Sequence, residues 1–211
     1  MACAICQTRR PKRFCPGVRG DICTICCGTE REVSVACPLD CPYLQEAHRR
    51  EKPVSLEGVE VPNQDIRVSE SFLRENEALL AFLGDRLSAA ALETAGAADF
   101  DVRDALDALI RTYRTLQSGV YYESRPENAL ARPIYDAVQD AVTEFRRQEQ
   151  QERGLAKTRD ADVLGLLVFL QRLELDRNNG RRRGRAFLDL LRSFSASAGA
   201  GVAKTSSLVL P

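Results

Sequence analysis

The cysteines of this chain are confined to its N-terminal end. All eight lie between Cys3 and Cys41 of a 211-residue sequence, and the single histidine, His48, follows shortly after them. The first residues lack the apolar core of a secretory signal, so we expect a cytoplasmic protein in a reducing compartment. In such a compartment, clustered cysteines act as metal ligands more often than they form disulfides. The first fifty residues are therefore expected to bind metal.

The spacing of the cysteines predicts two structural zinc ions per chain. Two C-x2-C pairs are separated by sixteen residues, and two such turns place four thiolates around a tetrahedral Zn(II). Four further cysteines are the right number for a second site, and the adjacent Cys26 and Cys27 point in different directions, as a segment shared between two ions requires. We expect the first ion on Cys3, Cys6, Cys23 and Cys26, and the second on Cys15, Cys27, Cys37 and Cys41.

The end of the cysteine-rich segment is expected to contain a short strand and a helix. Residues 32–36 alternate in polarity, which favours a strand, and a helix start is predicted from Cys37, with Cys41 on the same face. If the chain is helical from Cys41, about 10 Å of rise separates that residue from His48. We therefore interpret His48 as a surface residue, and as the reserve ligand if Cys15 is free.

Residues 3–48 resemble the interleaved two-zinc modules of the treble-clef-like group, which includes RING, MYND and HIT-type zinc fingers. The likeness is closest to the HIT type, through the pattern C-x2-C-x8-C-P that starts at Cys3 and the C-x2-C that starts at Cys23. HIT-type fingers have a further cysteine where this segment has Val18. They also end in His-x3–4-Cys, whereas this segment ends in C-x3-C, from Cys37 to Cys41. The resemblance implies a module that binds proteins or scaffolds complexes, with nucleic-acid contact in some members.

The rest of the chain has the pattern of an all-α helical bundle. Apolar residues recur at helical spacing in five segments, and the run from Val163 to Leu170 is apolar all round, which predicts the most buried helix. Asp99 or Asp101 is a candidate N-cap, and Gly119 and Gly154 are expected stops. The predicted helices cover residues 72–87, 102–116, 133–154, 162–177 and 186–194.

These patterns divide the chain into four parts. We expect a small zinc-bound module with short strands and one helix at residues 1–50, and a linker at 51–65, where two prolines and a glycine interrupt the pattern. The helical bundle is expected at 66–195, and a flexible tail rich in Ala, Ser and Gly at 196–211.

Two basic segments are candidate contacts for a phosphate, an acidic partner or a nucleic acid. One is the loop between Cys6 and Cys15, and the other is a turn that opens a helix, where guanidinium groups and free backbone N–H groups can hold an anion. The alternatives are a solvated loop and a general preference for arginine in this sequence. The candidate residues are Arg9, Arg10, Lys12 and Arg13 in the loop, and Arg177, Arg181, Arg182, Arg183 and Arg185 in the turn.

Composition narrows the function. With 30 basic and 30 acidic side chains, the chain is not a cationic nucleic-acid coat, and its longest apolar run is too short to span a membrane. No phosphate-binding glycine loop, catalytic triad or HExxH motif is present, so we expect no enzyme and no small-molecule substrate. The sequence favours a non-enzymatic adaptor or regulator that binds a protein partner, with a nucleic-acid-binding regulator as the alternative.

Overall fold

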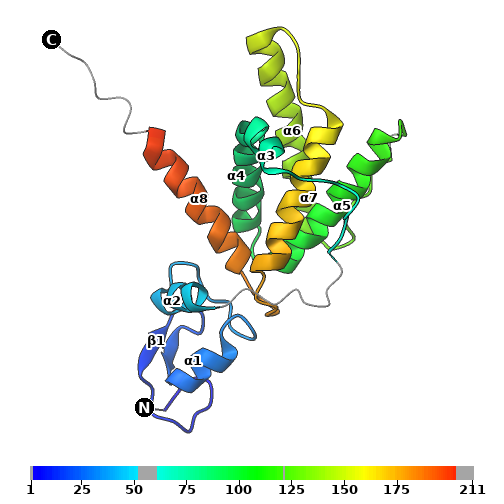
Figure 1. Cartoon of the computed structure of the whole chain (residues 1–211). Helices are drawn as coiled ribbons and strands as arrows, with labels where there is room; N and C mark the ends of the chain where they lie inside the picture. The colour runs from blue at the N-terminus through cyan, green and yellow to red at the C-terminus, as the bar shows by residue number, and fades with distance from the viewer. Residues whose placement is uncertain (1, 52–60, 121, 203–211) are drawn as a thin grey trace, which may run out of the picture.

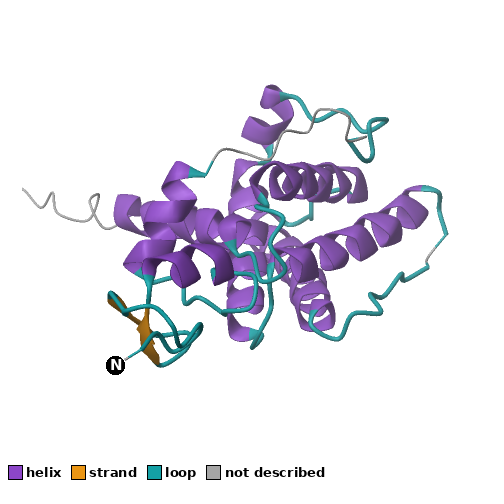
Figure 2. Cartoon of the chain, turned by 90° about the horizontal axis from the view of Figure 1, so that it is seen from below, coloured by secondary structure: helices purple, strands orange, loops and turns teal. Residues whose placement is uncertain are grey.

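A computed structural model of the chain describes residues 2–51, 61–120 and 122–202, with side chains through residue 194. A small N-terminal module lies at one end of a larger set of helices (Figure 1). Its two strands are the only ones among the described residues, and they lie at one edge of an otherwise helical molecule (Figure 2). The predicted fold class, a small module with short strands joined to an all-α bundle, is confirmed.

The module consists of a hairpin and two short helices, where a single helix starting from Cys37 was expected. Strands β1 (Arg13–Cys15) and β2 (Gly20–Ile22) are antiparallel, with Phe14 opposite Asp21. Helix α1 (Thr24–Glu30) follows directly, and α2 (Pro42–Arg50) begins at a proline, which is tolerated in a first turn because that N–H has no helical partner. Few apolar residues are buried here: the module's buried cluster is Cys3, Cys15, Ile22, Cys23, Cys26 and Val35.

The bundle is built around α7 (Asp160–Arg177). This helix is buried almost all round, as the apolar run predicted, and it packs on α5 (Asp99–Gln117). Helix α6 (Ala131–Arg153) packs on α5 and on α4 (Glu77–Glu93), and α4 also contacts α8 (Ala186–Val202). One continuous cluster of apolar side chains joins these helices. Burying such a cluster is the main favourable free energy of the bundle.

The helix boundaries agree with the glycine signals. Gly119 and Gly154 follow α5 and α6 with φ of 78° and 79°, in the left-handed region that glycine adopts without strain. At the start of α5, Ala98 is the N-cap residue, and Asp101 accepts a hydrogen bond from its N–H at 2.8 Å. Neither Asp99 nor Asp101 is the N-cap residue that was expected, because both lie inside the first turn of α5.

Three predicted elements were wrong. The helix expected at 72–87 is two helices, α3 (Glu70–Glu75) and α4, because the chain leaves helical geometry at Asn76. No strand forms at 32–36: Glu32 has φ 54°, and Val33 is exposed while Val35 is buried, although strand residues two apart share a face. Helix α8 continues through the alanine-rich segment to Val202, well past residue 194, because alanine favours helix.

The expected linker and tail fall largely outside the described residues. Residues 52–60 and 203–211 are not described, but the end of the linker is bound to the bundle. Arg114 donates to the side chains of Asn63 and Asp65 at 2.8 and 2.7 Å, and Arg172 donates to the carbonyl of Asn63 at 2.7 Å. The chain is thus anchored on α5 and α7 before α3 begins.

Candidate metal centre

Four cysteines of the module come together as one cluster. The sulfur atoms of Cys3, Cys6, Cys23 and Cys26 all lie within 4.8 Å of one another. Four sulfurs bound to one zinc at 2.3 Å are about 3.8 Å apart. The cluster therefore needs to contract by at most about 1 Å to enclose a zinc ion. Soft thiolate sulfur in a tetrahedral set of four favours zinc over magnesium or calcium.

Local backbone geometry sets the cluster. Cys3 and Cys6 lie on a tight turn that the N–H of Gln7 closes by donating to the carbonyl of Cys3 at 2.8 Å. Gln7 has φ 55°, a left-handed conformation that disfavours a residue with a Cβ and that the turn enforces. Cys23 is the N-cap of α1, and its sulfur accepts from the N–H of Cys26 at 3.4 Å. A turn and a helix start thus bring the two pairs together.

The pKa values of Cys3, Cys6 and Cys26 are shifted in different directions. Hydrogen bonds from the side chain and N–H of Thr8 lower the pKa of Cys6 to about 5. Burial, together with hydrogen bonds to the neighbouring sulfurs, raises the pKa of Cys26 to about 12. Burial opposes ionisation of Cys3, but N–H groups that include that of Cys23, 3.3 Å from its sulfur, outweigh it and lower the pKa. A divalent cation supplies the positive charge that lets all four sulfurs ionise together.

The other four cysteines are not brought together as closely. Within the described part of the chain, no second group of three or more cysteine, histidine or carboxylate ligands meets the same distance limit. Burial raises the pKa of Cys37, and the charges of Cys15 and Cys41 add to this shift through space, so these three thiols are neighbours. The sulfur of Cys27 instead faces Arg13 and Arg31, whose guanidinium nitrogens are 3.7 and 3.6 Å away.

His48 is neither exposed nor part of the cysteine cluster. Its side chain is only 8% exposed, and its two ring nitrogens face Glu32 at 3.0 Å and Asp189 at 3.1 Å. The imidazolium form donates to both carboxylates. Burial by itself would lower the pKa of His48, but the hydrogen bonds to Glu32 and Asp189 outweigh burial and raise it. The surface interpretation failed because Asp189 is 141 residues away in sequence, and no local pattern reports such a partner.

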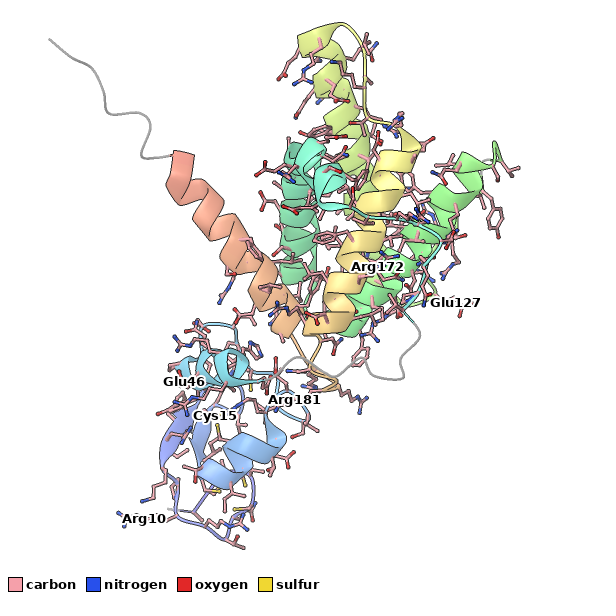
Figure 3. The ribbon with its side chains drawn as sticks, in the orientation of Figure 1. Arg10, Cys15, Glu46, Glu127, Arg172 and Arg181 are labelled. Carbon is pink, nitrogen blue, oxygen red and sulfur yellow. The ribbon has the colours of Figure 1, made fainter. Side chains whose placement is uncertain are left out.

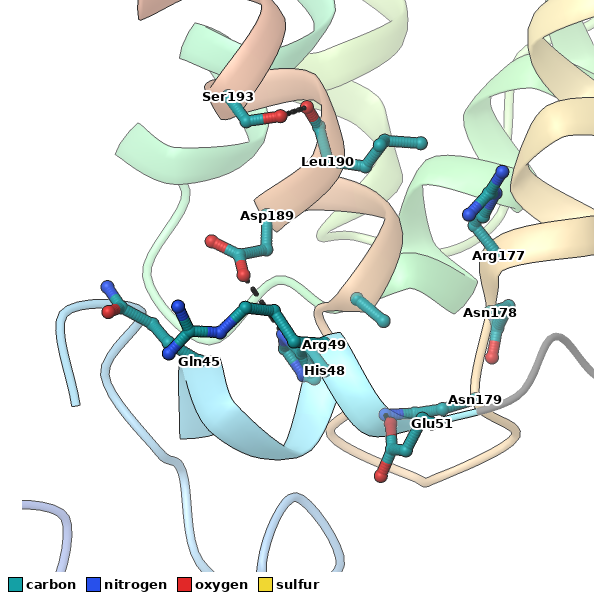
Figure 4. Close-up of a pocket in the computed structure, with 11 residues that line it drawn as sticks. Gln45, His48, Arg49, Glu51, Arg177, Asn178, Asn179, Asp189, Leu190 and Ser193 are labelled. Atoms are coloured by element: carbon teal, nitrogen blue, oxygen red, sulfur yellow. Dashed lines mark hydrogen bonds and ion pairs between the residues drawn. The ribbon is translucent and has the colours of Figure 1, made fainter. Parts of the chain in front are cut away.

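The His48–Asp189 contact lies at the junction between the module and the bundle (Figure 4). A cavity of about 370 Å³ opens beside it between α2 and the ends of α7 and α8. The charged side chains that line the cavity pair with other described residues. Arg49 pairs with Glu46, Arg177 with Asp176 and Glu51 with Arg181. The junction is thus a neutralised polar contact between the two parts.

Some of the basic candidate residues contact other side chains, and six of the candidates are exposed. Arg181 pairs with Glu51 at 2.7 Å, Arg185 is half-buried, and Arg13 stacks on the ring of Tyr43 at 3.9 Å. Arg9 hydrogen-bonds to Cys23, which raises the pKa of Arg9. The exposed candidates are Arg9, Arg10, Lys12, Arg177, Arg182 and Arg183. Arg10 lies at the tip of the module, whereas Arg181 lies where the module meets the bundle, so the two basic segments are separate (Figure 3).

Sequence analysis missed the buried acidic residues at the junction. Glu32, Asp99 and Glu174 are fully buried. Asp99 accepts from the N–H groups of Phe187 and Leu188 at the start of α8, and burial raises its pKa to about 7. Glu174 binds Arg103 at 2.7 Å. Isolated acidic residues read as surface charge in a sequence, and only the fold shows that these are internal.

Comparisons of the chain with protein-family models, curated proteins and solved structures find no match. None of the helices in the described ranges has the length and apolar character needed to cross a membrane.

Proposed function

We propose that this protein is a non-enzymatic adaptor whose N-terminal module is organised by zinc. The observation that carries the proposal is the cluster of four cysteine sulfurs within 4.8 Å of one another. Because protein sulfur fills all four tetrahedral positions, a zinc ion there has no open position for water or substrate. A closed site of this kind stabilises a fold, whereas a catalytic zinc keeps a position free.

We assign a second zinc to Cys15, Cys27, Cys37 and Cys41. The effect of Cys15 and Cys41 on the pKa of Cys37 supports this assignment, and Cys27 and Cys37 both pack against the buried cluster that contains Cys15. The order of a cysteine turn, a hairpin and a helix that starts at the second cysteine pair supports the treble-clef resemblance.

The surface of the module supports a protein partner. Four large apolar side chains of this small unit are exposed, and two of them, Phe14 and Ile25, are 61% and 52% exposed. Exposed aromatic and aliphatic side chains on a small rigid unit are typical of a protein-binding surface. Arg10 and Lys12 are exposed close to Phe14 in sequence. These features favour a partner surface with apolar and acidic side chains.

Two measurements test the proposal. Elemental analysis of protein purified without chelator should give two zinc ions per chain; one ion would contradict the second site, and none would contradict the proposal. Affinity capture from native lysate should recover a partner that binds the purified chain directly. Phe14→Ser with Ile25→Ser should abolish this binding, whereas Leu155→Ser, at an equally exposed position in the bundle, should leave it unchanged. Equal loss with both variants would contradict the module as the binding surface.

A further inference from the structure

Glu32 is a residue of the module whose buried side chain binds a loop of the bundle. It lies in the short connection between α1, which carries Cys26 and Cys27, and Cys37. Its side chain is fully buried and its backbone has φ 54°. A residue with a Cβ adopts this left-handed conformation only where its surroundings hold it there. The position of Glu32 therefore depends on the structure of the module on both sides of it.

One loop of the bundle closes around Glu32. The loop of residues 178–185, which joins α7 to α8, presents every second residue to it. The Glu32 carboxylate accepts from the side-chain amide of Asn179 and from the N–H of Arg185, both at 2.8 Å, and stands 3.7 Å from Arg181. The Glu32 carbonyl accepts from the N–H of Arg183 at 2.8 Å. A single residue of the module thus binds four residues of this loop.

The other side of the loop is held by the bundle. Asp99 donates its N–H to the carbonyl of Gly184 at 2.8 Å, and its carboxylate accepts from the first N–H groups of α8. His48 connects Glu32 to Asp189 in the first turn of α8. The loop therefore has one anchor on the bundle and two on the module, since Glu51 at the end of α2 also accepts from Asn179 and pairs with Arg181. Only the anchors on the module depend on the metal centre.

We propose that Glu32 is a latch that couples metal binding at the cysteine cluster to closure of the loop of residues 178–185. This inference rests on the proposed metal centre. The buried cluster of the module consists mostly of cysteines, so loss of metal leaves too little apolar contact to hold Glu32 in its left-handed conformation. When Glu32 withdraws, Asn179, Arg183 and Arg185 lose its oxygens as acceptors, Arg181 keeps only its pair with Glu51, and the backbone of the loop opens to water. Loss of metal from the module thus changes the structure of the loop of residues 178–185 in the bundle.

Hydrogen exchange of the full chain tests the latch. Removing metal with a chelator should accelerate amide exchange in residues 178–188 by at least about tenfold, while the centres of α5 and α6 stay protected. Glu32→Gln should accelerate exchange in the same residues with metal still bound. The matched control is Glu46→Gln, because Glu46 pairs only with Arg49 and Arg50 of its own helix in the contacts we observe. Asn179→Ala tests the loop side without altering the module.

The outcomes separate the latch from the metal centre on which it rests. Metal content is measured on every sample by elemental analysis. A chain that binds metal but shows the same loop exchange with and without it overturns the latch and leaves the metal centre intact. Protection of the loop in both Glu32→Gln and Asn179→Ala also overturns the latch. A chain that binds no metal overturns the proposed function itself. Loss of metal in Glu32→Gln alone would show that Glu32 maintains the site rather than reporting its state, and the latch would fall.

Discussion

The module and the bundle are stabilised in different ways. The bundle buries a continuous apolar cluster contributed by five long helices, and it needs no ligand to account for its fold. The module buries only six residues as a cluster, four of them cysteines, and its strands are three residues long. A unit of about fifty residues with so little apolar contact depends on cross-links or metal for its stability. The proposed function therefore implies that the chain joins a fold that depends on metal to one that does not.

Metal removal should produce the largest difference between the two parts. Cys23→Ser removes a ligand from a site worth about 10–16 kcal/mol of folding free energy, so the module should unfold. The far-UV circular dichroism of α4 to α7 should persist, and Glu46→Gln should keep both metal and fold. If the helical signal collapses in Cys23→Ser, the bundle is not independent of the module.

A core substitution in the bundle should have the opposite pattern. Leu167 in α7 is fully buried, and Leu167→Ala should lower the free energy of unfolding by about 2–5 kcal/mol, because it leaves a cavity among packed side chains. Urea unfolding followed by circular dichroism measures this loss. Metal content should stay unchanged, and Leu155→Ala at an exposed position should change stability by less than about 0.5 kcal/mol. Metal loss in Leu167→Ala would contradict the division.

Asp99 should make the bundle less stable as the pH rises. Its pKa in the folded chain is about 7, against an ordinary value of 3.8. Between these values the folded state keeps a proton that the unfolded state has lost. The free energy of unfolding should therefore fall by about 1.4 kcal/mol per pH unit from about pH 4 to pH 7. Asn at this position keeps a side-chain oxygen for the N–H groups of α8 and does not titrate. The difference between wild type and Asp99→Asn should grow over this range, and a constant difference would contradict the raised pKa.

His48 should make the junction weaken at alkaline pH. Its pKa is raised in the folded chain, so the imidazolium contributes stability that is fully present below about pH 6.5, the unfolded pKa. That contribution is lost as the pH rises through the higher folded pKa, because the ring can then donate to only one of its two carboxylates. Amide exchange in the first turn of α8 should accelerate over this range in wild type. His48→Gln should remove the pH dependence, and a retained dependence would assign it to another group.

The exposed arginines Arg182 and Arg183 should have the smallest effect on the fold. Replacing both with alanine should change the free energy of unfolding by less than about 0.5 kcal/mol, because their side chains are exposed. The same variant decides the alternative function. If the protein binds RNA or DNA through this loop, affinity should fall, and the salt dependence should weaken by about one unit of slope per arginine. Binding that is absent or insensitive to salt would favour the protein adaptor.

Sequence reasoning succeeded where local chemistry decides the structure. Apolar periodicity placed the core of α5, α6 and α7, and Gly119 and Gly154 marked the ends of α5 and α6 because few other residues adopt positive φ without strain. The C-x2-C spacing selected the four cysteines that the fold brings together. Each of these signals depends on residues within a few helical turns of one another or on a fixed spacing between metal ligands.

The same reasoning failed where distant residues decide the structure. The turn at Glu32 replaced an expected strand because the loop before α8 and His48 bind the Glu32 side chain. The three buried carboxylates have partners far away in sequence. No pattern of spacing in one sequence contains that information.

Gly165 lowers the helix stability of α7 but lets α3 cover one end of the bundle core. A methyl group at this position of α7 would stand 2.6 Å from the ring of Phe72, which belongs to α3. Glycine within a helix costs about 1 kcal/mol relative to alanine. In return, the aromatic ring rests directly against the α7 backbone and covers one end of the core with a helix of only six residues. Because Gly165 has no methyl group, α7 can hold α3 against the core, although α3 has no buried residue of its own.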